Sequence, residues 1–150
     1  MSTVISQVRD AVNKLVEICR DGEAGFEAAA EAIKNSSVKA ELMQYSGQRS
    51  EFVIELEKAA EELGETPTTS GSVAGALHRG WIHLIKVAGT SDHSVLSACE
   101  RGEDSAVAAY REALNTALPS QIGALIASQF QAVKRVHDRI KLLRDMAENH

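Results

Sequence analysis

The chain has 150 residues, of which 44% are hydrophobic, 25% charged and only 4% aromatic. A chain of this length is the usual size of one domain and buries roughly 70% of its unfolded surface, so a core can form without metal or disulfides. The formal net charge of -5, with no Lys/Arg run, excludes nucleic acid as a partner, and the lack of a signal peptide or a long apolar run predicts a cytoplasmic protein without a membrane span.

Ala, Glu, Leu and Lys supply helix propensity and little favours strands, so the composition predicts an all-α fold. Asn35, Ser36 and Ser37 interrupt the first helical pattern, and either serine can act as the N-cap of the next helix. Pro119 fits the first turn of the last helix. Apolar residues at helical spacing predict four long helices over residues 3–34, 37–63, 91–118 and 119–148.

The connection between the second and third helices is long. Residues 65–72 are rich in Thr, Pro, Ser and Gly, and an amphipathic stretch over 72–88 predicts a short crossover helix. Its Trp81 lies on the apolar face, where it is expected to anchor this helix to the bundle. Such a path can return along the second helix, which makes the second and third helices parallel. Two antiparallel hairpins joined by one long crossover define a ferritin-like four-helix bundle, which we predict as a single domain over residues 1–150.

The motif Cys-x-x-Gly-Glu occurs twice, beginning at Cys19 and at Cys99, so that Glu23 and Glu103 are 80 residues apart. This repeat suggests two similar halves, each with one inward carboxylate. The cysteines lack the spacing of a zinc or redox pair and are expected to be buried and reduced. With the first and third helices antiparallel, the two thiols lie roughly 12 Å apart along the axis, too far for a disulfide. Four glycines are expected to permit close helix approach: Gly22, Gly75, Gly80 and Gly102.

Several polar residues fall within the apolar stripes, and counting from each hairpin turn places them near one level at mid-bundle. We interpret them first as an internal network in which Arg49 pairs with Glu23, Glu103 or both. We favour this interpretation because buried charges must be paired and Arg49 lies on the inward arc of its helix. The predicted central polar cluster comprises Glu23, Gln48, Arg49, Glu103, Gln129 and His137.

A metal site is the second interpretation. Ferritin-like di-iron sites take one Glu from each of two helices and a Glu-x-x-His motif from each of the other two. Glu23 and Glu103 match the single-Glu helices, but Lys134 stands where the motif ending at His137 requires Glu. We therefore expect no metal or other cofactor. The alternative is a single iron, manganese or zinc ion held by Glu23, Glu103 and His137.

Four stretches together carry a resemblance to a known family: Asp21-Gly22-Glu23, Ser70 to Trp81, Cys99 to Asp104, and His137 to Ile140. With them the chain resembles the bacterial ferritin-like four-helix-bundle family catalogued as a domain of unknown function. The resemblance implies the fold and a bacterial origin, with no activity attached. Ferroxidase chemistry of metal-binding ferritin relatives is not implied, because the chain departs from them at Gln48, Arg49 and Lys134.

These observations predict a non-enzymatic ferritin-like bundle whose degenerate metal site is replaced by a buried Glu/Arg/Gln/His network. A stress-related role, through a protein partner or as a homo-oligomer, is the expected setting. The alternative, from a different class, is a divergent metal-binding protein or oxidoreductase that uses Glu23, Glu103 and His137.

Overall fold

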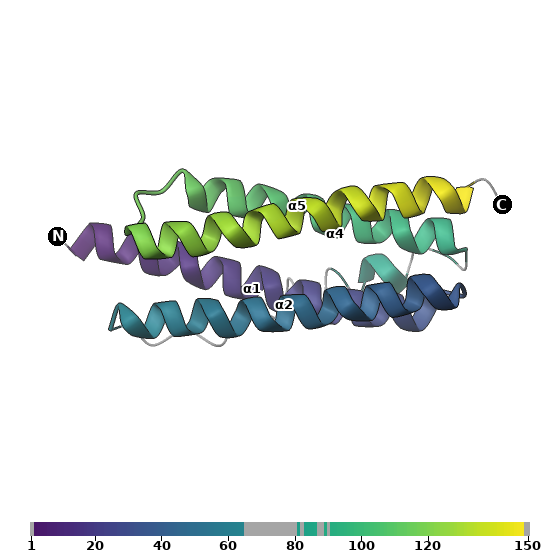
Figure 1. Ribbon diagram of the computed structural model, residues 1–150, viewed down its shortest axis with the longest axis horizontal. Helices are drawn as coiled ribbons and strands as arrows, with labels where there is room; N and C mark the ends of the chain where they lie inside the picture. Colours follow the sequence, from purple (N-terminus) through teal and green to yellow (C-terminus); the bar gives the residue numbers. More distant parts are fainter. Residues whose placement is uncertain (1, 65–80, 82, 87–88, 90, 149–150) are drawn as a thin grey trace.

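The computed structural model describes residues 2–64, 81, 83–86, 89 and 91–148. Residues 81 and 83–86 are helical and belong to the predicted crossover helix, whereas residues 72–80, 82 and 87–88 of that prediction lie outside the described part. The described residues contain no strand, which confirms the all-α prediction. Figure 1 shows the four long helices, α1 (Ser2–Ala32), α2 (Ser36–Glu62), α4 (Asp92–Leu114) and α5 (Ser120–Glu148).

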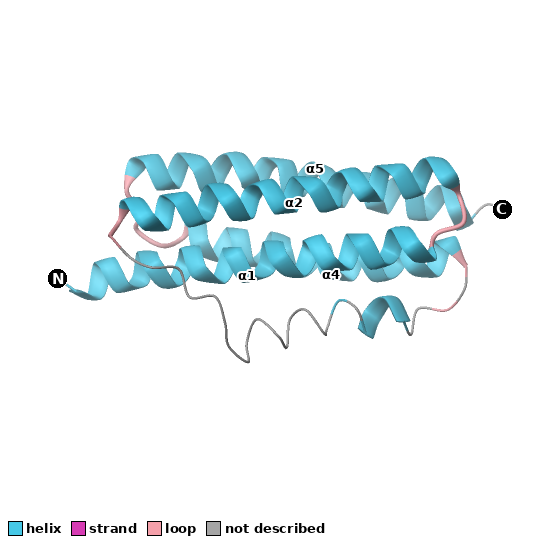
Figure 2. Cartoon of the chain, turned by 90° about the horizontal axis from the view of Figure 1, so that it is seen from below, coloured by secondary structure: helices cyan, strands magenta, loops and turns pink. Residues whose placement is uncertain are grey.

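The four helices form two antiparallel hairpins, α1 with α2 and α4 with α5 (Figure 1). The hairpins meet chiefly where α1 packs on α4, while α2 and α5 touch little. Helices α2 and α4 run in the same direction, and the helical residues 83–86 lie beside α1 and α4 (Figure 2). The ferritin-like connectivity predicted from the linker lengths is therefore confirmed.

The start of α2 is capped by Asn35, whose Oδ1 accepts a hydrogen bond from the Val38 N–H at 3.0 Å. The prediction that Ser36 or Ser37 caps this helix is wrong by one or two residues. Asn35 has the extended backbone that an N-cap needs, and its carbonyl already accepts from the Lys39 N–H.

The α4–α5 turn starts earlier than the apolar pattern indicates. Helix α4 ends at Leu114, with Asn115 as its C-cap. The Pro119 carbonyl accepts from the Gly123 N–H at 2.8 Å, so Pro119 precedes α5 as its cap rather than lying in its first turn. At the end of α2, Gly64 has φ +79, the conformation that commonly closes a helix.

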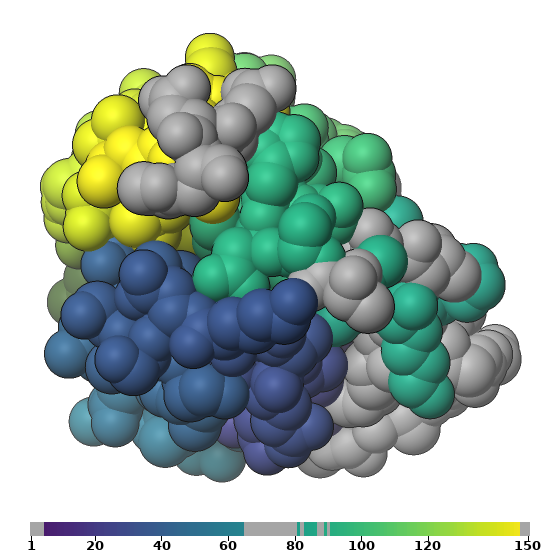
Figure 3. All heavy atoms as spheres, turned by 90° about the vertical axis from the view of Figure 1, so that its right-hand side faces the viewer, coloured from purple at the N-terminus to yellow at the C-terminus, as the bar shows by residue number. Residues whose placement is uncertain are grey.

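One carboxylate joins the two hairpins at the end of the bundle seen in Figure 3. Asp92, at the start of α4, accepts hydrogen bonds from the backbone N–H groups of Lys34 at 2.8 Å and Asn35 at 3.1 Å. Both N–H groups belong to the α1–α2 turn. The Asp92 carboxylate thus holds the register of one hairpin against the other.

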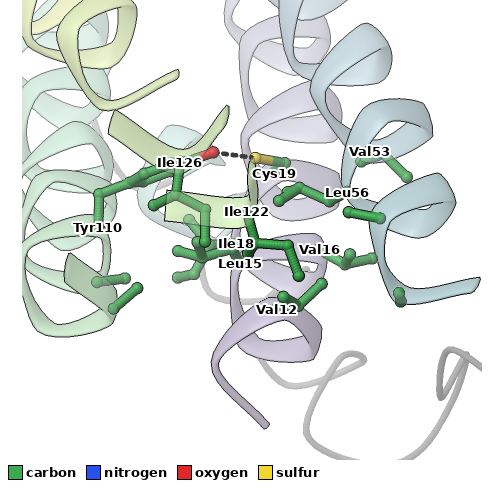
Figure 4. Packing of buried hydrophobic residues seen from close by; sticks show 14 of the residues in the cluster. Val12, Leu15, Val16, Ile18, Cys19, Val53, Leu56, Tyr110, Ile122 and Ile126 are labelled. Carbon is green, nitrogen blue, oxygen red and sulfur yellow. Dashed lines mark hydrogen bonds between the residues drawn. The ribbon is translucent and has the colours of Figure 1, made fainter. Parts of the chain in front are cut away.

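Buried apolar side chains form two clusters along the bundle axis. Helix α1 contributes buried residues between positions 8 and 19 to the first cluster, around Val12, and between positions 26 and 30 to the second, around Phe26, which Ile33 also joins just after the helix. Figure 4 shows part of the first cluster. The level of Gly22 lies between the clusters, and there the bundle buries charge instead of apolar surface.

Candidate functional site

The centre of the bundle holds a bidentate ion pair between Arg49 on α2 and Glu103 on α4. Arg49 Nη1 donates to Glu103 Oε1 at 2.6 Å, and Arg49 Nη2 donates to Glu103 Oε2 at 2.7 Å. The side chains are 1% and 0% exposed. Two parallel N–H···O bonds match the planar guanidinium to the carboxylate, so both Glu103 oxygens are engaged by one cation.

Three neighbours support the Arg49 side chain. A Cβ at Gly22 would lie 3.3 Å from Nη1 and 3.4 Å from Cγ, so this glycine makes room for Arg49. The guanidinium carbon lies 5.3 Å from the centroid of the Phe26 ring, and Nε donates to Gln48 Oε1 at 3.2 Å. Burial alone would lower the pKa of Arg49, but the charge and hydrogen bonds of Glu103 raise it above its ordinary value. The guanidinium is therefore a permanent cation.

The other half of the repeat does not form the equivalent pair. Gln129 and Glu23 are the counterparts of Arg49 and Glu103, since 129 minus 49 and 103 minus 23 are both 80. Gln129 is buried, but the Glu23 side chain is half-buried and makes no hydrogen bond or ion pair to the described residues. An uncharged amide does not compensate a buried carboxylate, so Glu23 remains partly in water.

Gln129 instead belongs to a second polar chain, which runs from the core to the surface. Tyr110 Oη donates to Gln129 Oε1 at 2.6 Å, and Gln129 Nε2 donates to Glu55 Oε1 at 2.9 Å. The phenol oxygen also lies 3.1 Å from Cys19 Sγ (Figure 4). Because the Tyr110 hydroxyl donates its proton to Gln129, the Cys19 thiol is the donor in its contact with Tyr110. Burial raises the pKa of Cys19 to about 11, which keeps the thiol protonated.

His137 lies in a surface groove between α4 and α5, away from the central pair. Its Nε2 is 2.7 Å from Asp104 Oδ1, and its Nδ1 is 3.3 Å from Asp138 Oδ1. Partial burial lowers the pKa of His137, but the two carboxylates outweigh this and raise it above the ordinary value. The groove is also lined by Arg111 and Lys134.

The structure therefore brings together three of the six residues of the predicted cluster, Gln48, Arg49 and Glu103. Gln129 is buried in a separate network, and Glu23 and His137 lie outside both networks. The sequence does not identify Tyr110 as part of a polar network, because this residue occupies a core position of its helix and the apolar pattern alone accounts for it. Its position four residues from the inward Ala106 was the signal that could have placed its hydroxyl in the core.

The residues proposed for a metal ion do not fit one. Both oxygens of Glu103 are bonded to Arg49, Glu23 lies among Arg20 and Glu27 at the surface, and His137 faces Asp104. Across the described part of the chain, no group of three or more His, Cys, Asp or Glu side chains is arranged to hold a metal ion.

Trp81 fills a slot between α1 and α4, immediately beside Phe26. A Cβ at Gly25 would lie 1.9 Å from the indole, and a Cβ at Gly102 would lie 2.2 Å from it. The rings of Trp81 and Phe26 have centroids 5.2 Å apart, and Trp81 is 5% exposed. Gly102, like its repeat counterpart Gly22, thus makes room for a side chain rather than for a neighbouring helix. Gly75 and Gly80 lie outside the described residues.

The four long helices and their order define a ferritin-like helical bundle, and a solved structure supports this class. A point mutant of Dps1 from Mycobacterium smegmatis matches with a TM-score of 0.83, over 96% of this chain and 99% of that chain, at 13% sequence identity. The likeness is one of fold. The model of the family described as a domain of unknown function, DUF2383, matches residues 7–116, and the chain belongs to this family.

A search of curated proteins gives no match to the sequence. In the described residues, no helix combines the length and the apolar character needed to cross a bilayer.

Proposed function

We propose that this protein is a non-enzymatic ferritin-like bundle in which an ion pair stands where a metal centre would be. It acts by binding proteins, a second copy of itself included. The observation that supports an ion pair in place of a metal centre is the bidentate contact between Arg49 and Glu103, both fully buried at mid-bundle. The side chain that closes the centre is itself a cation, so the inward carboxylate is already neutralised.

Electrostatics disfavour a dication at this position. Two unit charges 4 Å apart repel by about 4 kcal/mol at an effective dielectric constant of about 20, and a divalent ion doubles this term. The ion would also have to compete with Arg49 for both Glu103 oxygens. Displacing the guanidinium would leave a second buried charge without a partner.

Elemental analysis tests this proposal. The protein is purified from cells supplied with iron, manganese and zinc and then passed through gel filtration. We expect each metal to be far below one ion per chain, in the wild type and in Glu23→Ala alike. Glu27→Ala, which removes an exposed carboxylate from the same helix, is the matched control. Stoichiometric metal that Glu23→Ala, Glu103→Ala and His137→Ala remove would overturn the proposal in favour of a metal-binding protein.

The proposed setting is the bacterial cytoplasm, in a stress-related role. Fractionation of cells and abundance measured before and after oxidative or starvation stress test this part. A protein found outside the cytoplasmic fraction, or one whose level and partners are unchanged by stress, would contradict it.

A further inference from the structure

The outer face of α2 carries two large apolar side chains, Met43 and Ile54, that are exposed and have no partner in the described part of the chain. Met43 is 48% exposed and Ile54 is 58% exposed, which makes them two of the most exposed large apolar side chains described. Gly47 and Ser50 lie between them. The four residues follow the spacing i, i+4, i+7 and i+11, so they share one face of the helix. We call Met43, Gly47, Ser50 and Ile54 the α2 stripe.

Gly47 has no packing reason among the residues that the structure describes. A Cβ built at this position would have none of their atoms within 4 Å, whereas Cβ atoms at Gly22 and Gly102 would meet buried side chains. Glycine is one of the least favourable residues in a helix interior. A contact outside the chain that needs a small residue would account for it.

We infer that the α2 stripe is the contact through which two copies of this chain pair, with their α2 helices antiparallel. Along the α2 stripe the side chains are large, small, small and large, an order that is the same in both directions of the helix. An antiparallel copy therefore places its Ile54 against Met43 and its Ser50 against Gly47. The two small residues let the helix backbones approach, and the two-fold symmetry forms each contact twice. This inference rests on the proposed function, since it names the partner and the surface.

The charges at the two ends of α2 favour the antiparallel arrangement, although the same register sets Lys58 of one copy opposite Lys39 of the other. Its first turn carries no acidic residue, and its last turn carries no basic residue but includes Glu61 and Glu62. An antiparallel pair sets the acidic end of one α2 near the N-terminus of the other, where the helix dipole is positive. A parallel pair would bring the two acidic ends together.

The stripe suits a second copy better than it suits a membrane. Only two large apolar side chains are available, and the exposed Glu51 and Glu55 flank Ile54. Membrane-surface helices instead combine a broad apolar face with basic residues. One helix from each copy buries an area at the lower end of specific interfaces, so the pair is expected to be weak and to depend on concentration.

A charge-exchange series tests the pairing by sedimentation equilibrium of the full chain at increasing concentration. Met43→Glu and Ile54→Lys each disrupt both symmetric contacts, and each should weaken self-association at least tenfold. In the double variant Met43→Glu/Ile54→Lys, each contact brings opposite charges of the two copies together. Association should therefore return toward the wild-type value. Leu142→Lys, at a position 50% exposed on α5, is the control and should have no effect.

Gly47→Ala separates the interface from effects on the monomer. It should raise the unfolding midpoint of the dilute protein and weaken self-association at high concentration. A chain that is monomeric at every concentration, a dimer that neither single variant affects, or a double variant that stays as weak as the singles would overturn the pairing. Binding of anionic vesicles in place of dimerisation would also overturn it. None of these outcomes depends on the metal content of the protein, so elemental analysis tests the proposed function independently of the pairing.

Discussion

Arg49 and Gln129 are both buried and lie 80 residues apart at equivalent positions of the repeat, yet Arg49 bonds Glu103 and Gln129 bonds Tyr110. The apolar positions around them correspond closely. The matching buried pairs are Leu42 and Ile122, Val53 and Val133, Leu56 and Val136, and Ala60 and Ile140. The two halves therefore share a core pattern, and a single Arg decides which of the two repeated carboxylates is buried.

Removing Arg49 should be strongly destabilising. Arg49→Leu strands the buried Glu103 carboxylate, which should lower the free energy of unfolding by about 3 to 5 kcal/mol. The double variant Arg49→Leu/Glu103→Leu removes both charges and should recover most of this loss. Urea unfolding at pH 7 measures both. Lys14→Leu, which breaks the exposed pair with Glu112, is the control and should change stability by about 1 kcal/mol or less. An Arg49→Leu variant as stable as this control would contradict the central pair.

The Trp81 slot predicts a change in fluorescence. In Gly102→Ala the new Cβ would lie 2.2 Å from the indole, so Trp81 must move. We expect a red shift of the emission of this tryptophan, the only one in the chain, and a loss of about 1 to 3 kcal/mol in stability. Gly123→Ala is the matched helical control, because its Cβ would meet only Leu118 Cβ at 3.7 Å. Unchanged emission in Gly102→Ala would show that the slot is not filled by Trp81.

Asp21 predicts a pH dependence of stability. This side chain on α1 is 5% exposed, and its Oδ1 has no hydrogen-bond partner among the described residues. Burial raises the pKa of Asp21 from 3.8 to about 8. The folded protein therefore retains a proton that the unfolded chain releases. Its contribution to stability is complete below pH 3.8 and is lost as the pH rises toward 8.

The test for Asp21 compares Asp21→Asn with the wild type by urea unfolding between pH 4 and pH 9. Asp21→Asn should be more stable than the wild type by a few kcal/mol at pH 8, and the difference should shrink toward pH 4. Asp10→Asn, at an exposed position of the same helix, should show no such trend. A difference independent of pH would mean that Asp21 is not held protonated.

The contact between His137 and Asp104 should also make the protein less stable as the pH rises, but by less than Asp21 does. Because the pKa of His137 is raised in the folded protein, its contribution is complete below the unfolded pKa of about 6.5 and is lost as the pH rises through the folded pKa. Asp104 is 62% exposed, so solvent screening limits this contribution to about 1 kcal/mol. His137→Gln should therefore destabilise more at pH 5 than at pH 8, and the exposed His83→Gln should not. An NMR titration of His137 with an ordinary midpoint would contradict the pairing.

The helices could be read from the sequence because apolar periodicity is a local property, and a helix must bury the face that this period defines. The level of each polar residue along the bundle also followed from counting, since the rise per residue is constant. The direction in which each side chain points around its helix axis followed less directly from the sequence. His137 is one residue from the buried Val136 and is turned by about 100° into the surface groove, so equal height did not bring it to Glu103.

The sequence by itself determined the class of bundle, the antiparallel hairpins, the 80-residue repeat and the presence of an Arg on an inward arc. Only the tertiary structure decided that Arg49 takes Glu103 and not Glu23, that Tyr110 directs Gln129 elsewhere, and that Trp81 occupies the space left by two glycines. The reason is physical. Periodicity determines which face of a helix is buried, but the choice of partner depends on distances of a few ångströms between side chains on different helices, and these exist only once the helices have packed.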